Sequence, residues 1–166
     1  MCKKRLSLLL WLLLWLPVFA ISKNKVSTAG WRNTDYTVEC VGTGVEGTQQ
    51  MKVYFYFKKE KEAGVYAKKS AVDAVLFRGI ASGVTGCATQ PLVNSQQMQE
   101  HDAYFKKFFQ AGGDYIIYIS ASTDRLTDRI KVGDRYKAAM EISVNLKELR
   151  KRLENDKIIR SLSSGF

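Results

Sequence analysis

The clearest pattern of apolar and polar positions runs from Gln49 to Lys59, where the two kinds of side chain alternate. A period of two is typical of a β-strand with one buried face. A shorter β-branched run from Tyr36 to Val41 precedes it, so the pattern predicts a β-hairpin. The apolar row is Met51, Val53, Phe55 and Phe57, and the opposite row is Lys52, Tyr54, Tyr56 and Lys58.

Between Glu60 and Arg78 the pattern becomes helical. Apolar residues recur there at intervals of seven, three and four, and a stripe of alanines would allow the helix to lie close to a sheet. A second helix is predicted from about Asn94 to Gln110, with an aromatic face and a stop at Gly112. The residues that define the two helices are Val65, Val72, Val75, Leu76, Ala63, Ala67, Ala71 and Ala74 in the first, and Tyr104, Phe105, Phe108 and Phe109 in the second.

Three more elements follow. Asp114 to Ser122 is typical of a buried strand, Arg135 to Asn145 alternates again, and Asn145 with Glu148 resembles a capping box before an amphipathic helix. The order β-β-α-α-β-β-α predicts an α+β fold, a two-layer sandwich in which helices cover one face of a mainly antiparallel four-stranded sheet. The strand row is Tyr136, Ala138, Met140, Ile142 and Val144, and the helix row is Leu146, Leu149 and Leu153.

The first twenty residues have the three parts of a secretory signal. Three cations precede an apolar run from Leu6 to about Leu16, and Ala20 offers a small residue for cleavage. The apolar stretch from Leu6 to Ile21 is shorter than the ~20 residues that span a membrane as a helix. We therefore expect residues 1–20 to be a cleaved signal peptide, 21–34 a flexible N-terminal arm and 35–166 a single domain.

Export changes the charge and the cysteine count. The leader takes three of the 26 cations and none of the 16 acids, which lowers the net charge from +10 to +7. Such an excess favours solubility and attraction to anionic surfaces but selects no partner. Cys40 and Cys87 remain in the mature chain, and an oxidising compartment favours a disulfide between them.

Two segments are candidates for binding. The loop from Gly79 to Asn94 is long for a compact domain, which is typical of a functional segment. The polar row of the alternating strand places aromatic rings beside cations, which could stack on sugars or bases, although Tyr is also simply a good strand former. The candidate binding residues are Lys52, Tyr54, Tyr56, Lys58, Ser82, Thr85 and Gln90.

The segment from Gly42 to Gly47 fits the G-x-G-x-x-G pattern of dinucleotide-binding loops. That loop requires a helix directly after the third glycine, whereas Thr48 to Lys59 has the period of a strand. We interpret it as a glycine-rich hairpin connection, and no cofactor is expected.

The chain offers little for catalysis or metal binding. His101 is the only histidine, and the spacing of Asp124, Asp128 and Asp134 is not that of a calcium loop, so no metal site is expected. An imidazole can activate a thiol, so Cys87 with His101 is the one catalytic alternative. A disulfide between Cys40 and Cys87 would exclude this catalytic alternative.

The phrases ECVGTGVEGTQ, KKSAVDAVLFRGI and SGVTGC resemble small exported envelope proteins of Gram-negative bacteria, over roughly residues 36 to 120. Their strand pair leading into an Ala-rich helix is similar to envelope lipoprotein and flagellar accessory domains. The resemblance implies a periplasmic or outer-envelope location and assigns no catalytic residues. The chain departs from the lipoprotein members because no cysteine follows the leader directly.

The leading hypothesis is a non-catalytic exported domain, periplasmic or extracellular, that binds an envelope protein or a cell-wall polymer. The alternatives are a cysteine-dependent envelope hydrolase and a basic extracellular nucleic-acid binder, of which the second is less favoured. A membrane would be contacted only through the leader, before cleavage.

Overall fold

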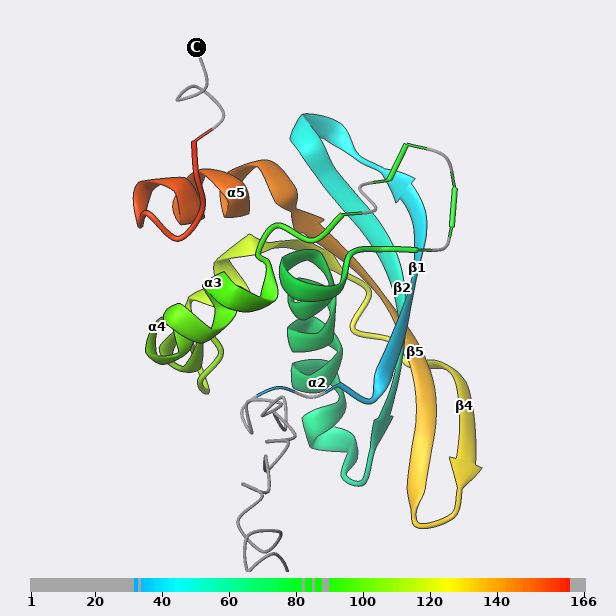
Figure 1. The fold of residues 1–166 in the computed structure, drawn as a ribbon. Coiled ribbons are helices and arrows are strands. Elements are labelled where there is room, and N and C mark those ends of the chain that lie inside the picture. Colours follow the sequence, from blue (N-terminus) through cyan, green and yellow to red (C-terminus); the bar gives the residue numbers. More distant parts are fainter. Residues whose placement is uncertain (1–31, 33, 82, 85, 88–89, 162–166) are drawn as a thin grey trace, which may run out of the picture.

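A five-stranded antiparallel sheet forms one layer of the protein and helices form the other (Figure 1). The computed structural model describes residues 32, 34–81, 83–84, 86–87 and 90–161. The α+β sandwich with helices on one face is confirmed, with five strands where four were predicted. The strands are β1 (Tyr36–Thr43), β2 (Thr48–Phe57), β3 (Ile119–Ser122), β4 (Thr127–Val132) and β5 (Arg135–Asn145).

The sheet is organised around β5. One edge of β5 pairs with β2 from Asn145 opposite Thr48 to Tyr136 opposite Phe57. Its other edge is shared, because β3 pairs with the end of β5 and β4 with its beginning. Strand β1 completes the predicted hairpin with β2, through a short 3₁₀ turn at Val45–Gly47. The glycine-rich segment is therefore a hairpin connection, as its pattern indicated.

The alternating rows of β2 and β5 supply the sheet side of the core. The four predicted apolar side chains of β2 are at most 2% exposed, and those of β5 after Tyr136 are equally buried. Helix α2 (Glu60–Asp73) lies across them through its alanine stripe, of which no residue is more than 1% exposed. Val65 was predicted on the buried face and this was wrong: its side chain is 47% exposed.

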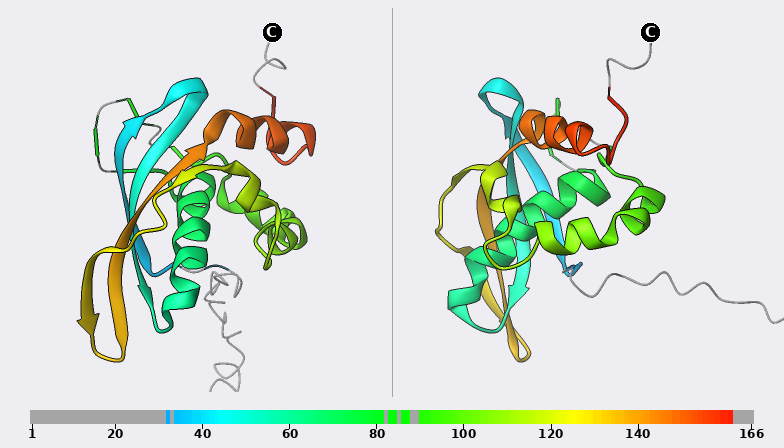
Figure 2. Two further views of the ribbon diagram at one scale, coloured as in Figure 1. Left: turned by 180° about the vertical axis from the view of Figure 1, so that it is seen from behind. Right: turned by 90° about the vertical axis from the view of Figure 1, so that its left-hand side faces the viewer.

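The other helices lie on the same side of the sheet as α2 (Figure 2). A π-helical turn η3 (Ala74–Arg78) extends α2, and α5 (Leu146–Asn155) follows β5 directly. The predicted helix from about Asn94 to Gln110 is two helices, α3 (Ser95–Glu100) and α4 (Asp102–Phe108), separated at His101. Asn94 begins α3 with a capping box to Gln97.

The predicted strand from Asp114 to Ser122 is wrong in its first half. Residues Asp114–Tyr118 form a 3₁₀ helix, η4, and only Ile119–Ser122 is strand β3. Tyr115 and Tyr118 are buried while Ile116 and Ile117 between them are 47% and 70% exposed. A spacing of three places the two tyrosines on one side of a 3₁₀ helix, whereas a strand would separate them.

Candidate functional site

The face of the sheet that points away from the helices is covered by none of the described helices, and we call it the open face (Figure 1). Every second residue of β1, β2 and β5 reaches it, because successive side chains of a strand point to opposite faces. Its side chains lie in the registered rows Thr37–Tyr54–Ala139, Glu39–Lys52–Glu141 and Tyr56–Lys137.

Three of the four residues predicted on this strand, Lys52, Tyr54 and Tyr56, lie on the open face, whereas Lys58 follows the last residue of β2. Lys52 Nζ lies 5.4 Å from the centre of the Tyr54 ring, and Lys137 Nζ from β5 lies 5.7 Å from the same ring. Arg135 places its guanidinium carbon 4.7 Å from the centre of the Tyr56 ring. The face therefore carries two tyrosines that are each held by cations, at the distances of cation–π contacts.

The cations of the open face are largely balanced by acids. Lys52 pairs with Asp128 at 2.7 Å, Lys58 with Asp134 at 2.6 Å and Arg135 with Asp35 at 2.5 Å. The hydrogen bond to Asp128 raises the pKa of Lys52, and the hydrogen bond from Lys58 lowers the pKa of Asp134. Glu39 and Glu141 add two more carboxylates in the row of Lys52.

Sequence reasoning missed the part of the open face that β5 supplies. Arg135 and Lys137 of β5, together with Asp128 of β4, complete the contacts of the predicted residues but were not predicted. The alternation of β5 contained the signal, because fixing its apolar row assigns Arg135 and Lys137 to the opposite face. Their pairing with the tyrosines of β2 depended on the register of two strands far apart in the chain.

The long loop after η3 is held against the outer edge of β1. The predicted disulfide joins Cys40 to Cys87 and is confirmed, with 6.4 Å between the two Cα atoms. Gly83 forms an isolated parallel β-bridge with Cys40, and the Val84 N–H donates a hydrogen bond to the Cys40 carbonyl at 3.1 Å. A Cβ on Gly83 would lie 2.1 Å from the Cys40 carbonyl oxygen, and its φ of +122° also favours glycine. Of the predicted loop residues, Gln90 is exposed, and Ser82 and Thr85 lie outside the described residues.

The disulfide bears on the catalytic alternative. A sulfur in a disulfide bears no thiolate, so Cys87 lacks the nucleophile that a cysteine hydrolase needs. His101 lies at the junction of α3 and α4, where its carbonyl accepts a hydrogen bond from the Phe105 N–H at 3.1 Å.

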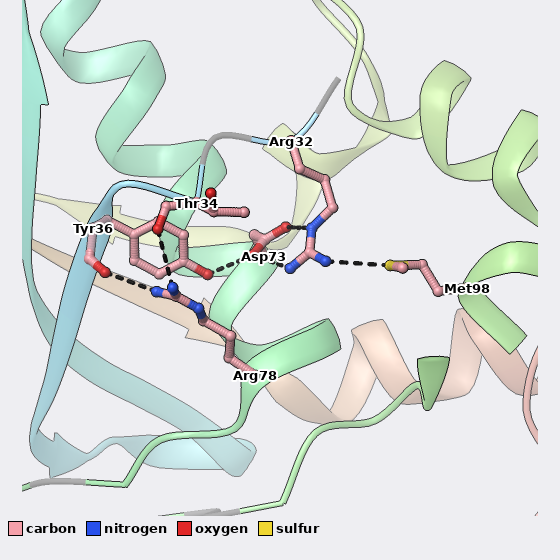
Figure 3. A network of polar contacts seen from close by, with 6 residues as sticks. All are labelled: Arg32, Thr34, Tyr36, Asp73, Arg78 and Met98. Atoms are coloured by element: carbon pink, nitrogen blue, oxygen red, sulfur yellow. Dashed lines mark hydrogen bonds and ion pairs between the residues drawn. The ribbon is translucent and has the colours of Figure 1, made fainter. Parts of the chain in front are cut away.

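A polar network beneath the edge of the sheet was not predicted (Figure 3). Asp73 of α2 is 3% exposed, and it accepts hydrogen bonds from Arg32 at 2.6 and 2.8 Å and from the Tyr36 hydroxyl. Arg78 donates to the carbonyls of Tyr36 at 2.7 Å and Thr34 at 3.0 Å, and it stacks on the Tyr36 ring.

This network fixes the start of the domain and has the character of a structural clamp. Burial, followed by the charge of Asp73, raises the pKa of Tyr36, so its hydroxyl stays protonated and donates. Arg32 also lies over the Phe77 ring, 4.5 Å from its centre. The described end of the predicted flexible arm therefore contacts the domain.

The described residues hold neither a metal-binding cluster nor a membrane-spanning helix. They contain no group of three or more His, Cys, Asp or Glu side chains placed to hold a metal ion. Among the same residues, no helix has the length and apolar character to cross a membrane. No protein-family model, curated protein or solved structure matches the chain.

Proposed function

We propose that the protein is an exported, non-catalytic domain of the bacterial envelope that binds another envelope protein through its open face. The leader pattern of residues 1–20 and the resemblance to Gram-negative envelope proteins support export. The Cys40–Cys87 disulfide also supports it, because such bonds persist in oxidising compartments.

The observation that carries the proposal is the open face, which bears two tyrosines and is covered by none of the described helices. Tyrosine and arginine are enriched in protein interfaces, where rings supply contact area at a low entropic cost. Tyr54 and Tyr56 are held in place by Lys137 and Arg135, so less freedom would be lost on binding. A sheet face of this kind fits a partner protein with its own mixed charges.

The balance of charge on the open face argues against a polyanion as its partner. Nucleic-acid sites use cations to neutralise phosphates, which requires cations without competing acids nearby. Lys52 and Arg135 on this face, and Lys58 just beyond the end of β2, each have a carboxylate partner. A nucleic acid would have to displace those acids, whereas a protein can supply complementary charges of both signs.

A matched pair of charge reversals tests the proposal. Lys137→Glu changes the centre of the open face, and Lys106→Glu makes the same change on α4, on the helical side. We expect detergent-solubilised envelope proteins to retain the wild-type chain and the α4 variant alike. The affinity of the open-face variant should fall by about tenfold or more, since like charges across an interface repel.

Protein-free cell-wall polymer serves as the second arm of this experiment. Retention on the polymer, with loss in the Lys137→Glu variant, would identify a polymer as the ligand in place of a protein. Equal retention of the Lys137→Glu variant and the wild type on the protein fraction would overturn the assignment of the open face.

A further inference from the structure

A groove of about 380 Å³ lies on the helical side of the sheet, between the first turns of α2 and the segment that leads into β4. Its floor is apolar and is made by Ala63, Leu126 and Met140. Ala63 and Met140 are at most 2% exposed, so the floor belongs to the core. The volume is in the range of small-molecule sites.

Two ion pairs cross the groove from α2 to the opposite wall. Glu60 pairs with Arg129 at 3.1 Å, and Lys68 pairs with Asp124 at 2.8 Å. Two turns of helix, about 12 Å of rise, separate Glu60 from Lys68. The apolar floor therefore has a cation and an anion at each end.

Charged groups at the rim retain bonding capacity toward the groove. Within the described chain, Asp124 uses Oδ1 for both Lys68 and Ser122, and Arg129 uses Nη1 for Glu60. The guanidinium carbon of Arg129 also lies 4.5 Å from the centre of the Tyr136 ring, a cation–π contact that helps to position the side chain. Hydrogen bonds from Lys68 and Ser122 lower the pKa of Asp124, so it is ionised at neutral pH.

Gly64 lines the same groove about one turn into α2, and nothing within the described chain requires a glycine there. A Cβ at this position would meet no atom within 4 Å, and the backbone is ordinary helix. Glycine within a helix is less stable than alanine by about 1 kcal/mol. The missing side chain keeps the groove open at a cost in helix stability.

We propose that this groove binds a zwitterionic dipeptide with small apolar side chains. Its carboxylate would pair with Arg129, its ammonium with the second oxygen of Asp124, and its side chains would cover the floor of Ala63, Leu126 and Met140. Peptides of this chemistry arise from the D-amino-acid ends of cell-wall stems or from the L-amino acids of degraded protein. The groove and the open face lie on opposite sides of the sheet, so the two proposals fail independently.

The probes are D-Ala-D-Ala and L-Ala-L-Ala, each titrated into the full mature chain labelled with ¹⁵N, with amide shifts as the readout. We expect saturable shifts at α2 and at residues 124–129. Acetylated and amidated versions of the dipeptides, which lack the charges, should give none. Stronger binding of the D form would identify the cell wall as the source, and equal or stronger binding of the L form would identify protein-derived peptides.

Three substitutions locate the site. Gly64→Leu fills the groove and Arg129→Gln removes the partner of the carboxylate, and each should weaken binding about tenfold or more. Val65→Leu adds the same kind of side chain to the adjacent, exposed position of α2 and should leave binding unchanged. Gly64→Leu also replaces glycine with a better helix former, so the variant should fold.

Absence of saturable shifts with both dipeptides would overturn the proposal. Binding that survives both Gly64→Leu and Arg129→Gln would overturn it equally, because the ligand would then sit elsewhere. Lys137→Glu on the open face should leave dipeptide binding as it is.

Discussion

At the scale of single residues, the buried carboxylate of Asp73 is bonded to Arg32 and Tyr36 and so joins the start of the domain to α2. Removing one partner of a buried ion pair leaves the other uncompensated, which is destabilising by about 3 kcal/mol or more. We therefore expect Asp73→Ala to lower the free energy of unfolding by about that amount, measured by urea titration with circular dichroism.

Asp128→Ala is the matched control, because it breaks the ion pair with Lys52 on the open face, where the Asp128 side chain is 55% exposed. Exposed pairs of this kind contribute under about 1 kcal/mol. Equal losses in the two variants would show that Asp73 is not a clamp.

Asp156 gives a prediction for the dependence of stability on pH. Burial alone would raise its pKa, but hydrogen bonds from Arg152 at 2.5 Å and from Tyr104 at 2.8 Å outweigh burial and lower it. A carboxyl whose pKa is lower in the folded state stabilises above its unfolded pKa of about 3.9, and this contribution is lost as the pH falls through the folded value. The wild type should therefore lose stability relative to Asp156→Asn as the pH falls from about 5 into the acid range below the unfolded pKa, in urea titrations. A constant difference across that interval would contradict this assignment.

At the scale of elements, the disulfide holds the loop after η3 to β1. Cys40 and Cys87 are 47 residues apart, and closing a loop of that length stabilises by about 4 kcal/mol on the chain-entropy account. We expect a phosphine reductant to lower the free energy of unfolding by up to that amount. The Cys40→Ser/Cys87→Ser double variant should be insensitive to the reductant and as unstable as the reduced wild type. Equal stability of the oxidised and reduced forms would contradict this role.

The individual elements also show which parts of the fold could be predicted from the sequence. Strands β1, β2 and β5 and helices α2 and α5 could be predicted because each buries one face and so shows a period. Strand β4 was missed because all six of its residues are exposed, so no apolar row marks it. It is defined by its pairing with β5 and by the turn at Gly133, whose φ is +61°.

Helix breaks and short 3₁₀ turns escaped prediction for a related reason. The run DYIIYISAS is apolar throughout, and periodicity cannot separate a buried strand from a 3₁₀ helix followed by a strand. Similarly, Met98 of α3 and Phe105 and Phe108 of α4 are all buried, so one apolar stripe continues past His101 although the helix is interrupted there.

At the scale of the whole molecule, the open face and the Asp73 clamp were predictable to different degrees. The row of Lys52, Tyr54 and Tyr56 followed from the alternation of one strand alone, and the three residues share one face of β2. The clamp joins residues 41 positions apart, and no local pattern pairs Arg32 with Asp73. The excess of positive charge in the sequence does not describe the open face, because folding places Asp35, Asp128 and Asp134 beside its cations.

The central claim is that the open face binds a partner in the envelope, and crosslinking in intact cells tests it most directly. A photo-crosslinking phenylalanine derivative would replace Tyr54 on the open face and, as the control, Lys106 on α4. We predict a discrete adduct with an envelope protein from position 54, lost when Lys137→Glu is added, and no such adduct from position 106. No adduct from position 54, or the same adduct from both positions, would contradict the account.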